Sequence, residues 1–139
     1  MTTVATATDL AVAAEISVPA DLSEVSAATA VVEVLTGRAW VPLCDLALLV
    51  PGRGVAALLP DGRQAAVFRD HLDRVHAVAN RDPFTGAYVL SRGLLGSTPD
   101  GRIYVASPLL KQRFDLVTGE CLDDDGVRID VHTTRVSPA

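Results

Sequence analysis

The sequence predicts an antiparallel all-β fold, either a sandwich or a small barrel, on three observations. From Arg38 onward, short apolar runs of four to eight residues alternate with turn dipeptides, which is the spacing typical of such folds. Pro60-Asp61-Gly62 separates two of these runs; Asp-Gly favours a hairpin because glycine accepts a positive φ without steric cost. The segment 127–136, VRIDVHTTRV, alternates apolar and polar residues with the period of a half-buried strand.

The expected elements follow in chain order. Residues 1–36 form an N-terminal extension, expected to be mobile or partly helical, and residues 37–139 form the β domain. Residues 31–35, VVEVL, fit either the end of a helix or a first strand. The expected strands after them are GVAALL (54–59), QAAVF (64–68), VHAVA (75–79), RIYVAS (102–107), RFDLV (113–117) and VRIDVHTTRV (127–136).

Composition and charge exclude several classes of function. The net charge is −5 and no basic stripe is present, so nucleic-acid binding is not expected, because phosphate contacts need clustered Lys and Arg. No apolar run approaches the roughly 18 residues of a membrane span. The N-terminus lacks the basic region of a signal peptide, and we expect a cytoplasmic protein. Cys44 and Cys121 are expected to be reduced core thiols.

The three histidines belong to no catalytic or metal-binding motif. His71 and His76 flank a predicted hairpin turn, and we expect both to be exposed loop residues. His132 falls on the polar face of the predicted last strand, where solvent exposure is expected. The charged residues of the intervening turn are expected to be solvated; they are Asp70, Asp73 and Arg74.

Two long loop-like stretches stand out, NRDPFTGAYVLSRG (80–93) and SPLLKQRFDLVTGECL (107–122). Both resemble the loops of Rieske-type domains, in which a C-x-H and a C-x-x-H hold a [2Fe–2S] cluster. The residues shared with those loops are Pro83, Gly86, Pro108, Phe114, Thr118 and Gly119. On this alignment the four ligand positions hold Asp82, Phe84, Ser107 and Leu110. The chain is therefore expected to bind neither this cluster nor another metal.

The two stretches, with WVPLCDLALLVPGRGVAAL (40–58), resemble the small subunits of assimilatory NAD(P)H-dependent nitrite reductases. The resemblance covers about residues 38–136. It implies a Rieske-like fold that has lost its cluster and carries no catalytic residue or cofactor. It also implies a large-subunit partner with FAD, siroheme and a [4Fe–4S] centre, which reduces nitrite to ammonium with NADH or NADPH.

Two other functions fit a cluster-free Rieske-like domain. The chain could be a degenerate ferredoxin component of another oxidoreductase, such as an aromatic-ring oxygenase. That function is disfavoured because a carrier without its redox centre cannot carry electrons. It could also be a stand-alone β-sheet binding module, which only the length of the matching motifs disfavours.

Without metal, another interaction must hold the two loops together. Phe84 and Leu110 occupy the two histidine positions, and we expect them to form a small apolar cluster, since full burial of such a side chain contributes about 1.5–3 kcal/mol. The alternative is that one or both are exposed and mark a partner surface.

Polar residues of the loops fit a docking role. Arg92, Lys111, Gln112 and Arg113 place positive charge and hydrogen-bond donors on an otherwise acidic chain, and arginine pairs well with carboxylates at interfaces. Asp82 is expected to be an internal counter-charge for one of them. We expect these four residues to contact the large subunit.

Overall fold

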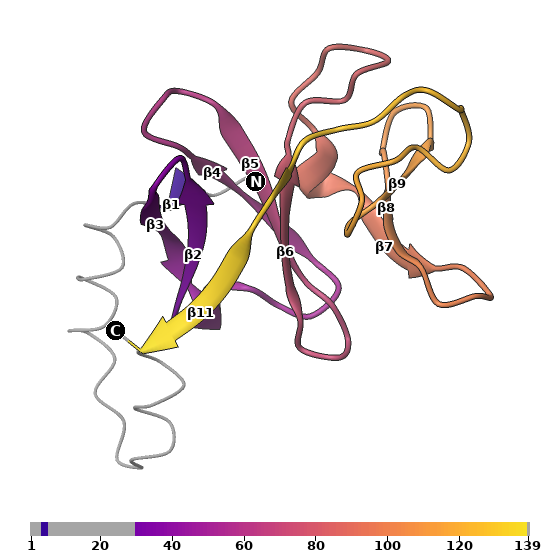
Figure 1. Cartoon of the computed structure of the whole chain (residues 1–139). Coiled ribbons are helices and arrows are strands. Elements are labelled where there is room, and N and C mark those ends of the chain that lie inside the picture. The colour runs from indigo at the N-terminus through magenta and orange to yellow at the C-terminus, as the bar shows by residue number, and fades with distance from the viewer. Residues whose placement is uncertain (1–3, 6–29, 139) are drawn as a thin grey trace.

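The computed structural model describes residues 4–5 and 30–138, which form three β-sheets (Figure 1). The first has the order β1 (Val4–Ala5), β4 (Gly54–Leu58), β5 (Gln64–Arg69), β6 (Val75–Ala79), β10 (Val131–His132). The second has the order β11 (Thr134–Pro138), β2 (Ala30–Thr36), β3 (Ala39–Asp45). The third has the order β7 (Leu94–Ser97), β8 (Ile103–Ala106), β9 (Arg113–Asp115). All pairs except β1 with β4 are antiparallel, so the predicted fold class is confirmed.

The only helical elements in this part of the chain are two short 3₁₀ turns, η1 (Leu46–Leu48) and η2 (Leu90–Arg92). No helix among the described residues is long and apolar enough to cross a membrane.

The predicted hairpins from β4 to β6 are confirmed. At the β4–β5 turn the Asp61 carboxylate accepts a hydrogen bond from the backbone N–H of Arg63 at 3.0 Å, and Gly62 has φ +90°. That φ lies in the left-handed region, where glycine avoids the Cβ clash. The turn residues therefore determine where the chain reverses.

Strand β5 is shared by two hydrophobic cores. Ala65 and Val67 belong to a core that also includes β2 and β3, whereas Ala66 and Phe68 belong to a second core beneath β7–β9. Successive side chains of a strand point to opposite faces, so a strand buried on both faces has an uninterrupted apolar run. This explains the sequence QAAVF. With few aromatic residues in the chain, the first core consists mainly of Val, Leu and Ala.

The predicted boundary after residue 36 falls inside a hairpin. Residues Ala30–Thr36 form β2, the central strand between β3 and β11. The strand interpretation of VVEVL is therefore confirmed, and the helix interpretation is wrong for these residues. The remaining expectation for the extension concerns residues 1–3 and 6–29, which lie outside the described residues.

The prediction of one strand over residues 127–136 is wrong. The segment bridges Glu120 through Arg128, then pairs with β6 as β10, and then pairs with β2 as β11. The segment crosses from the loop-bearing sheet to the other two sheets. Its alternation of buried and exposed side chains therefore does not continue to residue 136. Val131, on the apolar side of the expected alternation, is 39% exposed, and His132, predicted to be exposed, is half-buried.

Both cysteines are buried and unpaired, as predicted. Burial, reinforced by the neighbouring Asp45, raises the pKa of the Cys44 thiol to about 12. Since thiolates rather than thiols react, Cys44 is an inert core residue.

Candidate functional site

A buried hydrogen bond joins the two cluster-type loops. The hydroxyl of Ser107 donates to a carboxylate oxygen of Asp82 at 2.6 Å, and both side chains are almost fully buried. Both residues are among the four that the resemblance to Rieske-type loops aligns with cluster ligands. A polar contact therefore connects the two loops.

The first loop is organised around Asp82. Its second carboxylate oxygen accepts from the backbone N–H of Phe84 at 2.8 Å, and its carbonyl accepts from the N–H of Gly86 at 2.7 Å. Gly86 has φ +78°, and an added Cβ would lie 3.2 Å from the Arg81 guanidinium. Asp82 thus stabilises its own turn and also binds the second loop.

The second loop is organised around Ser107. Its carbonyl accepts from the N–H of Lys111 at 3.0 Å, and its own N–H donates to the carbonyl of Gln112 at 2.9 Å. Lys111 has φ +66°, which is uncommon for a residue other than glycine. This conformation closes the turn and leaves the preceding side chains of Leu109 and Leu110 exposed.

The predicted Phe84–Leu110 cluster is not formed. Phe84 is half-buried and packs against the second core, with its ring centroid 6.1 Å from that of Phe114. Leu110 is instead 57% exposed. One apolar residue therefore anchors its loop inward, and the other faces solvent. The two stretches are joined by the Asp82–Ser107 hydrogen bond and by the Phe84–Phe114 contact.

The residues at the four ligand positions do not fit a [2Fe–2S] cluster. Such a centre takes four thiolate or imidazole donors, whereas these positions supply one carboxylate, one hydroxyl and two hydrocarbon side chains. The Asp82 carboxylate is already engaged by Ser107 and by the Phe84 N–H. In the described part of the chain, no three His, Cys, Asp or Glu residues converge as a metal site.

The four residues predicted to dock a partner do not share one environment. Arg113 binds the Asp123 carboxylate through Nε and Nη2, at 3.1 and 2.8 Å, and its guanidinium lies 5.4 Å from the centroid of Tyr104. The side-chain hydrogen bonds from Arg113 lower the pKa of Asp123. Gln112 is half-buried, and its side-chain oxygen has no partner among the described residues.

The other two candidates are exposed. Lys111 lies in the tight turn of the second loop, and Arg92 lies at the end of η2, directly before β7. The side chains of these two residues are exposed, whereas that of Arg113 is half-buried and binds Asp123. Asp82 does not act as the predicted counter-charge: its hydrogen-bond partners are Ser107 and a backbone N–H.

A second polar site, centred on Asp70, was not predicted. The buried carboxylate accepts from the N–H groups of Leu72 and Arg74, from Nε of Arg74, and bonds Nε2 of His76 at 2.9 Å. Burial acts to raise the pKa of Asp70, but the hydrogen bonds from His76 and the turn outweigh it and lower the pKa to about 2.

The expectation of an exposed His76 and a solvated Asp70 is therefore wrong, while His71, Asp73 and Arg74 are exposed as expected. The signal for this site lies in the polar residue within the apolar run VHAVA. Strand β6 lies between β5 and β10, and a polar side chain buried in such a strand needs a hydrogen-bond partner.

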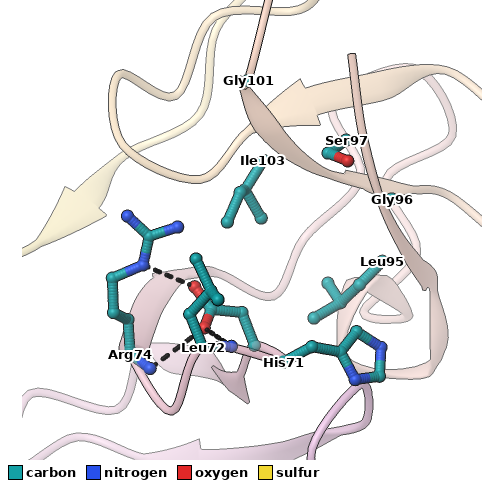
Figure 2. A pocket seen from close by; sticks show the side chains of 9 residues that line it. His71, Leu72, Arg74, Leu95, Gly96, Ser97, Gly101 and Ile103 are labelled. Atoms are coloured by element: carbon teal, nitrogen blue, oxygen red, sulfur yellow. Dashed lines mark hydrogen bonds and ion pairs between the residues drawn. The ribbon is translucent and has the colours of Figure 1, made fainter. Parts of the chain in front are cut away.

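A cavity of about 290 Å³ lies between this turn and the β7–β8 hairpin (Figure 2). Leu72, Leu95 and Ile103 give it apolar walls, and His71 and Arg74 stand at its border. The Asp70 carboxylate at its edge is engaged by the turn backbone, Arg74 and His76.

Comparisons with known proteins agree with the Rieske-like fold. A family model described as "Rieske-like [2Fe-2S] domain" matches residues 39–139. The nitrite reductase (NADH) small subunit of Salmonella typhimurium is 45% identical over 98 residues, covering 70% of this chain and 89% of that protein. The solution structure of a nitrite reductase [NAD(P)H] small subunit from Erwinia carotovora has a TM-score of 0.57 and 43% identity, covering 68% of this chain and 72% of that chain.

One further relative has a different architecture. The nitrite reductase [NAD(P)H] large subunit of Klebsiella oxytoca is 44% identical over 89 residues, which cover 64% of this chain but only 9% of that protein. A domain similar to this chain therefore also occurs within a much longer polypeptide.

Proposed function

The chain belongs to the family of Rieske-like [2Fe–2S] domains, and we propose that it is the non-redox small subunit of an NAD(P)H-dependent nitrite reductase. It acts by docking to a large subunit that carries FAD, siroheme and a [4Fe–4S] centre and reduces nitrite to ammonium in nitrogen assimilation. It works in the cytoplasm and contributes no catalytic residue of its own.

The observation that supports this proposal most directly is the 45% identity to a curated small subunit over 89% of that protein's length. The Klebsiella oxytoca protein supports an association with the large subunit, because a similar domain lies within one called a large subunit. A domain that can be part of the same polypeptide is well suited to act beside its partner as a separate chain.

The non-redox role is supported by the loops. Asp82 and Ser107 use their polar atoms to bind each other and the turn backbone, and Phe84 and Leu110 have no donor atoms. A ferredoxin role would require the cluster that these four residues do not fit. We propose that the loops serve docking, with Leu109, Leu110, Lys111 and Arg92 exposed for contact.

The test is co-expression with the large subunit. A tagged form of this chain should capture the large subunit with its flavin and siroheme, and nitrite turnover should differ with and without the chain. The isolated chain should contain no iron and should not reduce nitrite with NADH or NADPH. Stoichiometric iron in the isolated chain would refute the non-redox role, and failure to capture the large subunit would refute the docking role.

A further inference from the structure

Strand β7 (Leu94–Ser97) lies at an open end of the third sheet. The other end continues beyond β9, where Phe114 bridges Cys121 and Glu120 bridges Arg128. Within the part of the chain that the structure describes, β7 pairs with β8 alone. The N–H and C=O groups on one side of this strand therefore form no hydrogen bonds within the sheet.

The hydrogen-bond alternation shows which groups these are. At the end of the β7–β8 hairpin the N–H of Thr98 donates to the carbonyl of Arg102 at 2.8 Å. In an antiparallel ladder, bonded and non-bonded pairs alternate, so Gly96 belongs to the next bonded pair. The peptide groups of Leu95 and Ser97 consequently point away from β8, toward the open edge.

This edge lacks the features that usually block pairing with another chain. Edge strands are protected by charged residues, proline or bulges. The end strand β3 contains Pro42, and β11 contains Arg135 and Pro138. The sequence of β7 is LLGS, with neither proline nor charge. Its first residue, Leu94, is 75% exposed, the highest value among the described large apolar residues.

Two cavities border β7, one toward each end. The cavity of Figure 2 is lined by Leu95 and Ser97, together with Leu72, which is 71% exposed. A second cavity, of about 320 Å³, is lined by Leu94 and by residues 52–54 and 91–93. The buried hydroxyl of Ser91, which lines it, has no hydrogen-bond partner in the described chain. An added strand presents side chains at regular intervals, and cavities beside an edge can receive them.

The charges around this edge favour an acidic partner segment. Arg53 and Arg92 are exposed and line the second cavity, whereas Arg74 at the first is paired with Asp70 at 3.0 Å. The chain as a whole carries a net charge of −5, so two exposed arginines beside the Leu94 end of β7 contrast with the overall charge. Carboxylates at that end of an added strand would complement them.

We propose that β7 is a strand-addition site for an extended segment of the large subunit, apolar in its centre and acidic at the end that lies beside Leu94. The proposal rests on the proposed function and specifies where and how the partner binds. The site is continuous with the loops, because Leu94 pairs with Ala106, the residue before Ser107. Backbone hydrogen bonds to Leu95 and Ser97 provide affinity, and the two cavities select the side chains.

Residue-resolved hydrogen–deuterium exchange tests this directly. The amides of Leu95 and Ser97 should exchange rapidly in the isolated chain and slow by at least about tenfold in the complex with the large subunit. The amide of Gly96, already bonded within the sheet, is the internal control and should change much less.

The possible outcomes separate the two proposals. If a complex forms and the exchange of Leu95 and Ser97 is unchanged, strand addition is wrong while the subunit assignment stands. If no complex forms, both fail. Protection that depends on the concentration of this chain alone would show that a second copy occupies the edge, which also refutes the proposal.

Matched variants give an independent measurement. Leu94→Asp should weaken large-subunit binding by about tenfold or more, because it places a carboxylate where an acidic segment docks. Leu58→Asp, at an apolar position on β4 that is 52% exposed, should change binding by less than about threefold. Equal effects of the two variants, with both proteins folded by circular dichroism, would refute a role for the β7 edge.

Discussion

Ser107 and Asp82, 25 residues apart in the sequence, share a buried 2.6 Å hydrogen bond that joins two loops. Ser107→Ala would leave one oxygen of the buried Asp82 carboxylate without this donor. An unsatisfied buried polar group costs about 1–3 kcal/mol, and we expect the free energy of unfolding to fall by that amount in urea denaturation.

Asp82→Asn is the matched control, because an amide can accept from the Phe84 N–H and donate to the Ser107 hydroxyl. It should retain most of the stability that Ser107→Ala loses. A Ser107→Ala variant as stable as wild type would show that the contact does not hold the loops.

Phe84 and Leu110 should respond differently to truncation. Phe84→Ala removes a ring packed against Phe114 and should lower the free energy of unfolding by about 2 kcal/mol, less than the 3–5 kcal/mol typical of fully buried sites. Leu110→Ala removes an exposed side chain and should cost less than about 0.5 kcal/mol. Equal losses in thermal or urea denaturation would contradict the placement of these two residues.

Asp70 should make stability depend on pH in the acid range. Its folded pKa of about 2 lies below the ordinary value of 3.8, so the fold favours the ionised form. The resulting stabilisation, about 2 kcal/mol, is present above about pH 4 and is lost as the pH falls through about 2. Asp70→Asn should be less stable than wild type at pH 6, and the difference should shrink in urea denaturation between pH 4 and pH 2. A difference that does not change over this range would contradict the prediction.

Charge reversal should separate docking from folding. Arg92→Glu with Lys111→Glu should weaken capture of the large subunit by about tenfold at low salt, with a smaller effect at high salt because exposed charges are screened. Arg38→Glu, in the β2–β3 hairpin away from β7–β9 (Figure 1), is the control. If the double variant binds as tightly as Arg38→Glu, these two cations lie outside the interface.

The sequence predicted those parts of the fold that depend on local chemistry. Asp61-Gly62 and the apolar runs beside it determined β4 and β5, and the two loop motifs identified the Rieske-like family, which the relatives confirm. The crossing of residues 127–136 between sheets was not predicted, because it depends on where β2 and β6 lie in space. VVEVL remained ambiguous for the same reason, since only its neighbours β3 and β11 make it a strand.

Within the candidate site, the sequence predicted that the two loops meet but assigned the contact to the wrong pair. Hydrophobicity favoured Phe84 with Leu110, whereas Asp82 and Ser107 make the bond. The positive φ of Lys111 closes the turn that leaves Leu110 exposed, which explains part of this error. The residue type of Lys111 alone does not indicate such a backbone conformation. The Asp70–His76 pair was missed because burial on both faces of β6 depends on the assembled sheets.

The sharing of β5 between two cores has a consequence for how the molecule unfolds. Val67 and Phe68 are neighbours in the chain but pack into different cores, so neither core can come apart while the other keeps this strand in place. The domain should therefore melt in a single cooperative transition. A cavity made on one side, as by Val67→Ala, should loosen the loops supported by the opposite side, so distant core mutations can reduce partner binding without touching the docking face.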